Sequence, residues 1–435
     1  MPTLYLDNFR GFKETFIPLK EINFFVGENS TGKTSVLKLI KTISDPRFWI
    51  MQDFNIENAE LGYFSEIVSA NSINKKYFDI GILGDTTDKE NNISAIKMRF
   101  FDNEGAPELR EVHLINKNFN IQALISKSGI KYRYSKIDIE KIKENNKNRY
   151  FKLWLKENGL KNKRYKEIQI EETFFKQTFL FQLDTIISKE ISNINKLSSF
   201  KVPNFIKVPN FLKEVAWIAP IRSEPKRTYD KYNITFSPDG THAPYLLKKL
   251  LKNKSNVKDI LVKFGEDSGL FTDISIKKLG RSQFSPFELQ IGINNRTLKI
   301  TNVGYGVSQI LPLIIEVIAR HKNTWFAIQQ PEIHLHPKAQ AAFGDFIFKS
   351  FIKEQKKFII ETHSDYIIDR FRLRLNNNFK NKKNNPKSQI VFFSKTESGN
   401  STSIIEIHDN GSISENQPKE YRDFFVREQL ELIKI

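Results

Sequence analysis

One octapeptide near the amino terminus has the residue types and spacing of a phosphate-binding loop. GENSTGKT, residues 27–34, fits the pattern G-x-x-x-x-G-K-[ST]. In such a loop the glycines let backbone N–H groups close around phosphates, and the start of the next helix adds favourable partial charge. We therefore predict that the chain binds ATP with Mg²⁺. The residues expected to hold the nucleotide and its metal are Gly27, Asn29, Ser30, Gly32, Lys33, Thr34 and Ser35.

Two of these side chains have specific predicted tasks. The ammonium of Lys33 can reach the β- and γ-phosphates, and the hydroxyl of Thr34 can ligate Mg²⁺. A strand before the loop and a helix after it must position both groups. Residues 22–26, INFFV, form a short apolar run, and residues 36–43 repeat apolar side chains with a helical period. The alternative is a Gly/Ser turn that precedes an ordinary helix.

Changes in residue pattern divide the chain into three predicted parts. Residues 1–135 hold the phosphate loop and then alternate apolar and polar side chains, which is typical of an antiparallel sheet. Residues 136–214 are rich in Lys and Glu with helical spacing and predict an inserted helical arm, in which the repeat KVPNFI and KVPNFL at 201–212 predicts an extended connector. Residues 215–435 carry short apolar runs between helical periods, as in strands buried on both faces. The predicted class is α/β, with a mixed or parallel sheet, an antiparallel lobe and the helical arm.

Composition narrows the classes of function. Lys and Arg number 68 against 50 Asp and Glu, a formal charge of +18, which attracts polyanions such as DNA or RNA. Solvated lysines are the alternative explanation. The chain has no cysteine, which excludes disulfides, thiolate zinc sites and cysteine nucleophiles. The longest apolar run, 307–319, is too short to span a bilayer, so we expect a cytoplasmic protein without a membrane partner.

Five further segments accompany the loop in a definite order: FRGFKET at 9–15, WIAPIRSEPKR at 217–227, NVGYGVSQILPLI at 302–314, QQPEIHLHPKAQ at 329–340 and IIETHSDYIIDR at 359–370. With them the chain resembles ABC-type ATPase heads of the SMC, recombination-repair and OLD-like kind. It also resembles a subgroup of AAA-family ATPases with a characteristic carboxyl-terminal domain. The resemblance covers residues 1–60 and 215–435 and implies the fold of an ABC-type ATPase head.

The resemblance also implies how copies of the chain assemble. In such heads the nucleotide on one subunit's phosphate loop meets the signature segment of a second subunit, which makes a homodimer or a higher homo-oligomer. In this chain the signature would be 302–314, where Gly304 and Gly306 allow close backbone approach and Ser308 can donate to a γ-phosphate. Arg10 would steady the nucleotide, as an arginine does in similar heads. A solvated surface role is the alternative for Arg10.

The stretch AIQQPEIHLHP at 327–337 departs from the pattern that it resembles. In related heads an acid at the first position helps to hold Mg²⁺, and the next position often carries the general base. Here these positions are Gln329 and Gln330. A neutral amide can accept a hydrogen bond from metal-bound water, but it cannot abstract a proton at neutral pH. We therefore expect Gln329 to assist Thr34 at the metal, and Gln330 to lie beside the reacting phosphate without acting as a base.

The nearest acid to these glutamines is Glu332. We expect Glu332 to orient or activate the attacking water, helped by His363, with Glu361 as the alternative acid. His334 and His336 form a pair that could bind zinc, but no third ligand is evident and the resembled heads use this segment structurally.

Together these features predict a Mg-dependent ATPase whose cycle acts as a switch or sensor. The resemblance adds the expectation of a prokaryotic antiphage defence system, in which the ATPase controls a separate effector such as a toxin or nuclease. One alternative is a DNA repair or segregation head. A second is a nucleotide-gated scaffold with very slow hydrolysis, because of the two glutamines. A third is an OLD-type nuclease, although residues 390–411 lack the clustered acids that two-metal cleavage needs.

Overall fold

The computed structural model describes residues 2–423 except 57–58, 71, 73, 85–92, 117–118, 127–128, 158, 170–214, 221, 231–233, 254–255, 283–284 and 416. The chain forms two compact units. The first comprises residues 1–20, 29–214 and 393–402, and the second comprises residues 21–28, 215–392 and 403–435. The chain passes between the units within the phosphate loop itself, which begins in the second unit and ends in the first.

A six-stranded sheet runs in the order β10-β14-β15-β3-β16-β17. The first four strands are parallel: β10 (Val215–Ile218), β14 (Trp325–Gln329), β15 (Lys357–Glu361) and β3 (Ile22–Gly27). β16 (Ser388–Thr396) and β17 (Gly399–Ile407) complete it. Every residue of β3 is buried, which explains why its sequence is a continuous apolar run rather than an alternation. Parallel strands end at the same edge, so the carboxyl ends of β3, β14 and β15 lie together.

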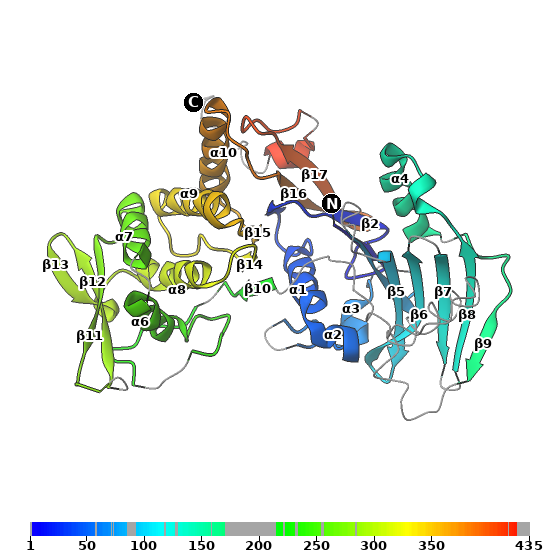
Figure 1. The fold of residues 1–435 in the computed structure, drawn as a ribbon, viewed down its shortest axis with the longest axis horizontal. Helices are drawn as coiled ribbons and strands as arrows, with labels where there is room; N and C mark the ends of the chain where they lie inside the picture. Colours follow the sequence, from blue (N-terminus) through cyan, green and yellow to red (C-terminus); the bar gives the residue numbers. More distant parts are fainter. Residues whose placement is uncertain are drawn as a thin grey trace, which may run out of the picture. The chain divides into compact units, whose positions relative to one another are not determined.

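Helices cover this sheet in the second unit (Figure 1). They are α6 (Ala243–Asn253), α7 (Asn256–Ser268), α8 (Tyr305–Ala319), α9 (Pro337–Glu354) and α10 (Asp365–Lys380). The ring of Phe371 on α10 meets Phe24 of β3 at 5.4 Å and Phe348 of α9 at 6.0 Å, so the helices are fixed to the sheet through aromatic contacts. A small antiparallel sheet of β11 (Asp273–Lys278), β12 (Phe287–Ile293) and β13 (Arg296–Lys299), followed by η3 (Ile300–Asn302), leads into α8.

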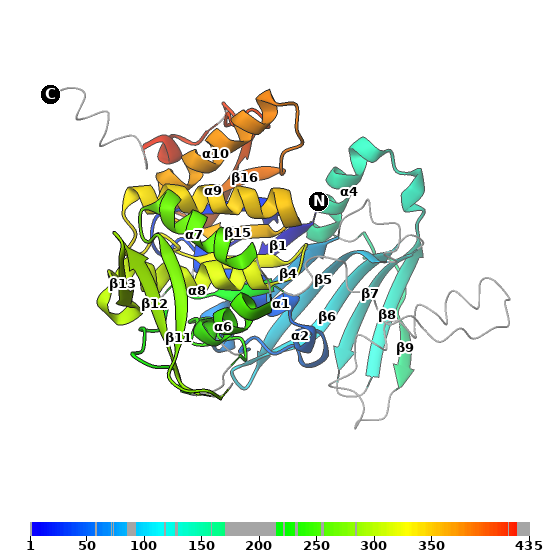
Figure 2. The same ribbon diagram turned by 60° about the vertical axis from the view of Figure 1, so that its left-hand side comes forward.

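The first unit is built on an eight-stranded sheet in the order β2-β1-β4-β5-β6-β7-β8-β9, and its strands pair antiparallel (Figure 2). The strands are β1 (Thr3–Asp7), β2 (Thr15–Pro18), β4 (Tyr77–Leu83), β5 (Ile93–Asn103), β6 (Ala106–Asn116), β7 (Phe119–Ser126), β8 (Gly129–Lys136) and β9 (Lys166–Gln169). The predicted antiparallel sheet is therefore present, and the α/β fold class with its two kinds of sheet is confirmed.

Helices pack on both faces of this sheet. On one face the rings of Phe48, Phe54, Phe78 and Phe100 form a cluster with centroids 4.9 to 6.5 Å apart. Helix α1 (Lys33–Ser44) leads directly into α2 (Pro46–Met51), which contributes Phe48, and α3 (Phe64–Ile67) follows. On the other face α4 (Glu144–Lys156) places Phe151, Trp154 and Leu155 against Tyr5 and Ala95. The alternating pattern of the strands thus serves two buried faces.

The helical arm predicted for 136–214 is only partly within the described residues. Its first part contains η1 (Ile139–Lys141) and α4, and then β9, which pairs with β8. Residues 170–214, which include the tandem repeat, lie outside the described residues, so the extent of the arm and the three-part division remain predictions. Among the helices that the structure describes, none has both the length and the apolar character needed to cross a bilayer.

Candidate functional site

The phosphate loop joins β3 to α1, as predicted from the sequence. Gly27, at the end of β3, has φ 142°, and Ser30 within the loop has φ 62°. Gly32 is the N-cap of α1 with φ 90°, and a Cβ there would lie 2.6 Å from the ring of Phe12. Only glycine satisfies both restrictions. Because the N-cap offers no side chain to the first turn, the start of this 12-residue helix suits an anion, so these residues fit a bound triphosphate.

Three other predicted nucleotide ligands stand in or beside the first turn of α1. Lys33 is buried, whereas Thr34 and Ser35 are partly exposed. Arg10 joins them: its Nη1 donates to the Ser35 hydroxyl at 3.1 Å, and its Nη2 donates to the Leu61 carbonyl oxygen. Burial lowers the pKa of Arg10, and its Nε has no hydrogen-bond partner among the described residues. The structure thus places Arg10 against α1, the helix that follows the phosphate loop, rather than on an open surface.

The two glutamines lie at the carboxyl end of β14. Gln329 pairs in register with Glu361 on β15. Gln330, the next residue, has φ 43° and its N–H donates to the Glu361 carbonyl oxygen at 2.8 Å. Both amide side chains are partly exposed, whereas Glu361 is buried. The turn at Gln330 therefore directs the chain away from the sheet directly after the position where an acid was expected.

Glu332 is fixed to the loop that follows β15. Its Oε2 accepts a hydrogen bond from the Thr362 hydroxyl at 2.9 Å, and its Oε1 accepts one from the His363 backbone N–H at 2.7 Å. Burial raises the pKa of Glu332, and these hydrogen bonds together with the charge of Arg222 oppose that rise. The structure therefore brings together the two residues that were predicted to share catalysis, Glu332 and His363. Their roles in catalysis remain predictions.

Sequence reasoning missed Arg222, whose charge lowers the pKa of Glu332. It lies in WIAPIRSEPKR, four residues beyond β10, and is 2% exposed. The side-chain amide of Gln309 on α8 makes two hydrogen bonds to the backbone of Arg222. The Arg222 N–H donates to Gln309 Oε1 at 3.2 Å, and Gln309 Nε2 donates to the Arg222 carbonyl oxygen at 3.3 Å. The available signal was an arginine a few residues after an apolar strand, although the sequence alone does not show whether such a residue is buried.

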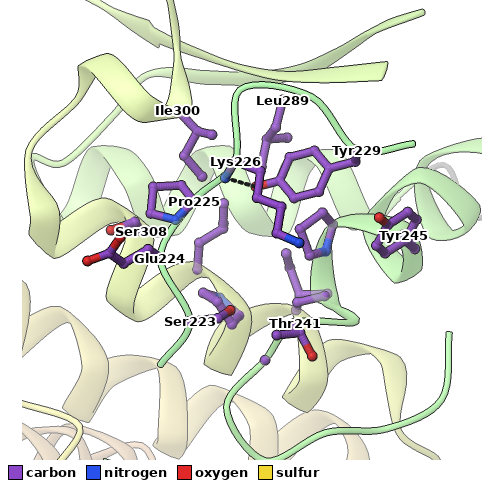
Figure 3. Close-up of a pocket in the computed structure, with 16 residues that line it drawn as sticks. Ser223, Glu224, Pro225, Lys226, Tyr229, Thr241, Tyr245, Leu289, Ile300 and Ser308 are labelled. Atoms are coloured by element: carbon purple, nitrogen blue, oxygen red, sulfur yellow. Dashed lines mark hydrogen bonds between the residues drawn. The ribbon is translucent and has the colours of Figure 1, made fainter. Parts of the chain in front are cut away.

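The predicted signature segment forms the start of α8. Ser308 lies within the first turn, is buried, and its hydroxyl donates to the Tyr305 carbonyl oxygen at 2.8 Å. It borders a small cavity of about 50 Å³ that segment 223–229 and helix α6 also line (Figure 3). A Cβ at Gly306 would lie 2.8 Å from the His334 carbonyl oxygen, whereas nothing lies within 4 Å of one at Gly304. The close approach at Gly306 is thus to a loop of the same chain.

The two histidines of the HLH segment have separate contacts. The ring of His334 meets Tyr305 edge-on at 4.7 Å. His336 is the N-cap of α9, and its Nδ1 accepts a hydrogen bond from the Ala339 N–H at 3.4 Å. Within the described part of the chain, no group of three or more acidic or histidine side chains is arranged to hold a metal ion.

Comparison with known proteins gave a family match and several similar structures. The family described as AAA ATPase domain matches residues 1–368. The comparison with curated proteins found no significant match. One similar solved structure is the SmcHead bound to the C-winged helix domain of ScpA, with 12% identity, coverage of 93% of this chain and 97% of that chain, and a TM-score of 0.45. A second is an Smc head domain with an extended coiled coil, bound to the C-terminal domain of ScpA, from Pyrococcus furiosus. It has 12% identity, coverage of 100% of both chains and a TM-score of 0.43. A third is the SMC head domain from Thermotoga maritima (11%, 93% and 98%, 0.34).

Proposed function

Because the chain belongs to the AAA ATPase domain family and is an ATP-binding ATPase of that family, we propose that it is a slow, Mg-dependent ATPase that works as a nucleotide-driven switch. The observation that carries the proposal is the loop between β3 and α1. There Gly32 adopts a conformation and a spacing that only glycine allows, and the helix that starts behind it has no side-chain cap, so its first turn suits an anion. Residues 27–35 would hold the phosphates, with Arg10 braced against Ser35.

The proposed metal site is made of neutral ligands. Thr34 would supply a hydroxyl to Mg²⁺ from the first turn of α1, and Gln329 would accept hydrogen bonds from metal-bound water. Bound Mg²⁺ neutralises charge on the phosphates during transfer. Because neither ligand is a carboxylate, we expect weaker metal binding than in a site with an acid at position 329.

The water-activating group in this proposal is Glu332. Its two carboxylate oxygens accept hydrogen bonds from the 362–363 loop and from its own backbone N–H, and a carboxylate can accept about four in all, so a water can also be bound and oriented there. The raised pKa makes this carboxylate a stronger base than an exposed one. His363 shares the loop and would assist. Glu361 is the weaker candidate, because it is buried within β15.

We expect slow turnover because Gln330 cannot act as a base beside the phosphate, which leaves Glu332 as the proposed base. A positioned general base contributes about 10²- to 10⁴-fold to a rate, and an amide cannot supply that contribution. A long-lived ATP-bound state suits a switch or a nucleotide-gated scaffold. The sequence resemblance supports the other expected parts of the function. These are a homodimer formed through an ATP sandwich, a separate effector and an antiphage role. Contact with nucleic acid has its support in the net charge of +18.

The test compares four single variants for ATP binding by calorimetry and for turnover with Mg²⁺. We expect Lys33→Ala to lose ATP binding, and Glu332→Gln to keep binding while turnover falls about 10²-fold. Gln330→Glu should raise turnover by about 10-fold or more, because it introduces a base beside the reacting phosphate. Gln330→Leu is the matched control and should not accelerate the reaction. ATP binding that survives in Lys33→Ala would remove the phosphate-loop assignment, and full turnover in Glu332→Gln would remove Glu332 as the base.

A further inference from the structure

The connection from α10 to β16 presents lysines that no acid neutralises (Figure 2, orange). It reads FKNKKNNPK, residues 379–387, and we call this segment the lysine loop. Its lysines are all exposed, and none of them has an ion pair among the described residues: Lys380, Lys382, Lys383 and Lys387. On α7 and α9, by contrast, Lys263 and Lys349 both pair with Asp267, at 2.8 and 3.1 Å. Unpaired like charges so close together attract a polyanion.

Two asparagines hold the lysine loop in one conformation. Asn378 Nδ2 donates to the Asn384 carbonyl oxygen at 3.0 Å and to Asn385 Oδ1 at 2.7 Å. Asn385 Nδ2 donates to the carbonyl oxygens of Leu375 at 2.9 Å and Asp409 at 2.7 Å. Because these bonds fix the loop before any partner arrives, a partner does not have to order it on binding.

A hollow of about 630 Å³ opens beside the lysine loop, and an aromatic ring lines it. The ring is that of Phe379, which is 51% exposed. The other lining residues are polar or charged: Lys380, Lys382, Lys383, Asn384, Asn385 and Asp409. Three lysines against one acid leave the hollow with a net positive charge. A hollow of this size can take a nucleotide unit, and a base can stack on an exposed ring while its phosphates meet the lysines.

The lysine loop lies away from the proposed ATP site. The Lys387 N–H donates to Glu21 Oε2 at 2.9 Å, and the Lys387 carbonyl oxygen accepts from the Ile22 N–H at 3.2 Å, so the loop ends beside the start of β3. The phosphate loop begins at Gly27, at the other end of that strand. The five steps along the strand, at about 3.3 Å each, separate the two ends by about 17 Å. The lysines are therefore free to meet an anion other than the triphosphate.

We propose that the lysine loop is a binding surface for single-stranded nucleic acid. Phosphates pair with Lys380, Lys382 and Lys383, and a base stacks on the ring of Phe379. This inference rests on the nucleic-acid contact proposed from the net charge and gives that contact a place and a form of partner. A duplex keeps its bases stacked on one another, so it offers no base to the ring. An acidic peptide would not need the ring, and a membrane surface would need more than one exposed apolar side chain in the loop.

The experiment measures the anisotropy of a short labelled oligothymidylate with the full chain over a range of NaCl concentrations. We expect Phe379→Ala to weaken binding about 10-fold and Phe379→Trp to keep it, because only the second retains a stacking ring. Lys380→Gln/Lys383→Gln should reduce the slope of log K against log salt by about 1.4, since each lost phosphate contact removes about 0.7. The control Lys322→Gln/Lys353→Gln removes the same charge from exposed positions of the second unit and should leave the slope unchanged.

Competition with other polyanions separates the alternative partners. Unlabelled duplex DNA, polyglutamate and vesicles of anionic lipid should each displace the oligonucleotide much less well than unlabelled oligothymidylate does. Equal competition by any of them would overturn the proposal, as would equal binding losses in Phe379→Ala and Phe379→Trp. A wild-type chain that binds the oligonucleotide through other residues, with both loop variants unaffected, would also overturn it and leave the nucleic-acid contact standing. Absence of binding by the wild type would remove that contact as well, whereas the ATP-dependent switch is tested separately by Lys33→Ala.

Discussion

Gly304 and Gly306 stand two residues apart at the start of α8, and their surroundings differ. A Cβ added at Gly304 would meet no atom within 4 Å, and the φ of Gly304 is −57°. A side chain at Gly306 would meet the backbone oxygen of His334, which cannot move without moving the turn after β14. The two glycines of the motif therefore differ in role, and Gly306 is needed for close packing within the chain.

This contrast gives a prediction at the residue scale. Gly306→Ala should lower the free energy of unfolding by about 1 to 3 kcal/mol, because the added methyl group forces α8 away from the 331–335 turn. Gly304→Ala should change it by no more than about 0.5 kcal/mol. Urea denaturation of both variants would measure this. Equal effects in the two variants would show that the contact with His334 does not determine the packing.

At the scale of elements, the eight-stranded sheet carries a buried polar network across its strands. Arg99 on β5 donates to both carboxylate oxygens of Asp79 on β4 at 2.7 and 2.8 Å. On β6, Glu111 bonds to His113 at 2.6 Å and accepts a hydrogen bond from Gln122 on β7. Strand alternation predicts that a polar face exists, whereas the cross-strand register decides which of its groups meet.

His113 makes the stability of this unit dependent on pH. Burial lowers the pKa of His113 below the usual 6.5. As the pH falls, this histidine therefore takes up a proton in the unfolded chain before it does so in the folded protein. The contribution is therefore fully present above pH 6.5 and is lost as the pH falls from 6.5 towards the lower folded value. We expect His113→Gln to flatten the loss of stability between pH 7 and 5 in chemical denaturation. His321→Gln, at an exposed position, is the control and should leave the slope unchanged; a slope that persists in His113→Gln would contradict the assignment.

At the scale of the whole molecule, the sequence resemblance predicts that two copies close around ATP. If so, turnover per chain should rise with protein concentration and then level off. Glu332→Gln, which should bind ATP without splitting it, should run as a dimer with ATP and Mg²⁺ and as a smaller species without them. Light scattering coupled to size exclusion measures this, with Lys33→Ala as the control that stays undimerised. A single mass for Glu332→Gln under both conditions would contradict the predicted sandwich.

The sequence by itself determined the local parts of this protein. Residue spacing, glycine positions and the apolar period predicted the phosphate loop, the strand before it, the helix after it and the antiparallel sheet. Such local elements depend on residues that are near one another in the chain. Glu332 and His363 were singled out because each follows an apolar strand within three residues, and their roles in catalysis stay predictions.

Only the tertiary structure decided which distant groups meet. It buried Arg222 beside Gln309, turned Ser308 towards the Tyr305 carbonyl oxygen, and placed Gly306 against His334. It also showed that residues 21–28 belong to the second unit and residues 393–402 to the first. A division of the chain into consecutive segments does not find this arrangement. The physical reason is that burial, strand order and long-range hydrogen bonds depend on how elements pack, and a local pattern of residue types leaves that packing open.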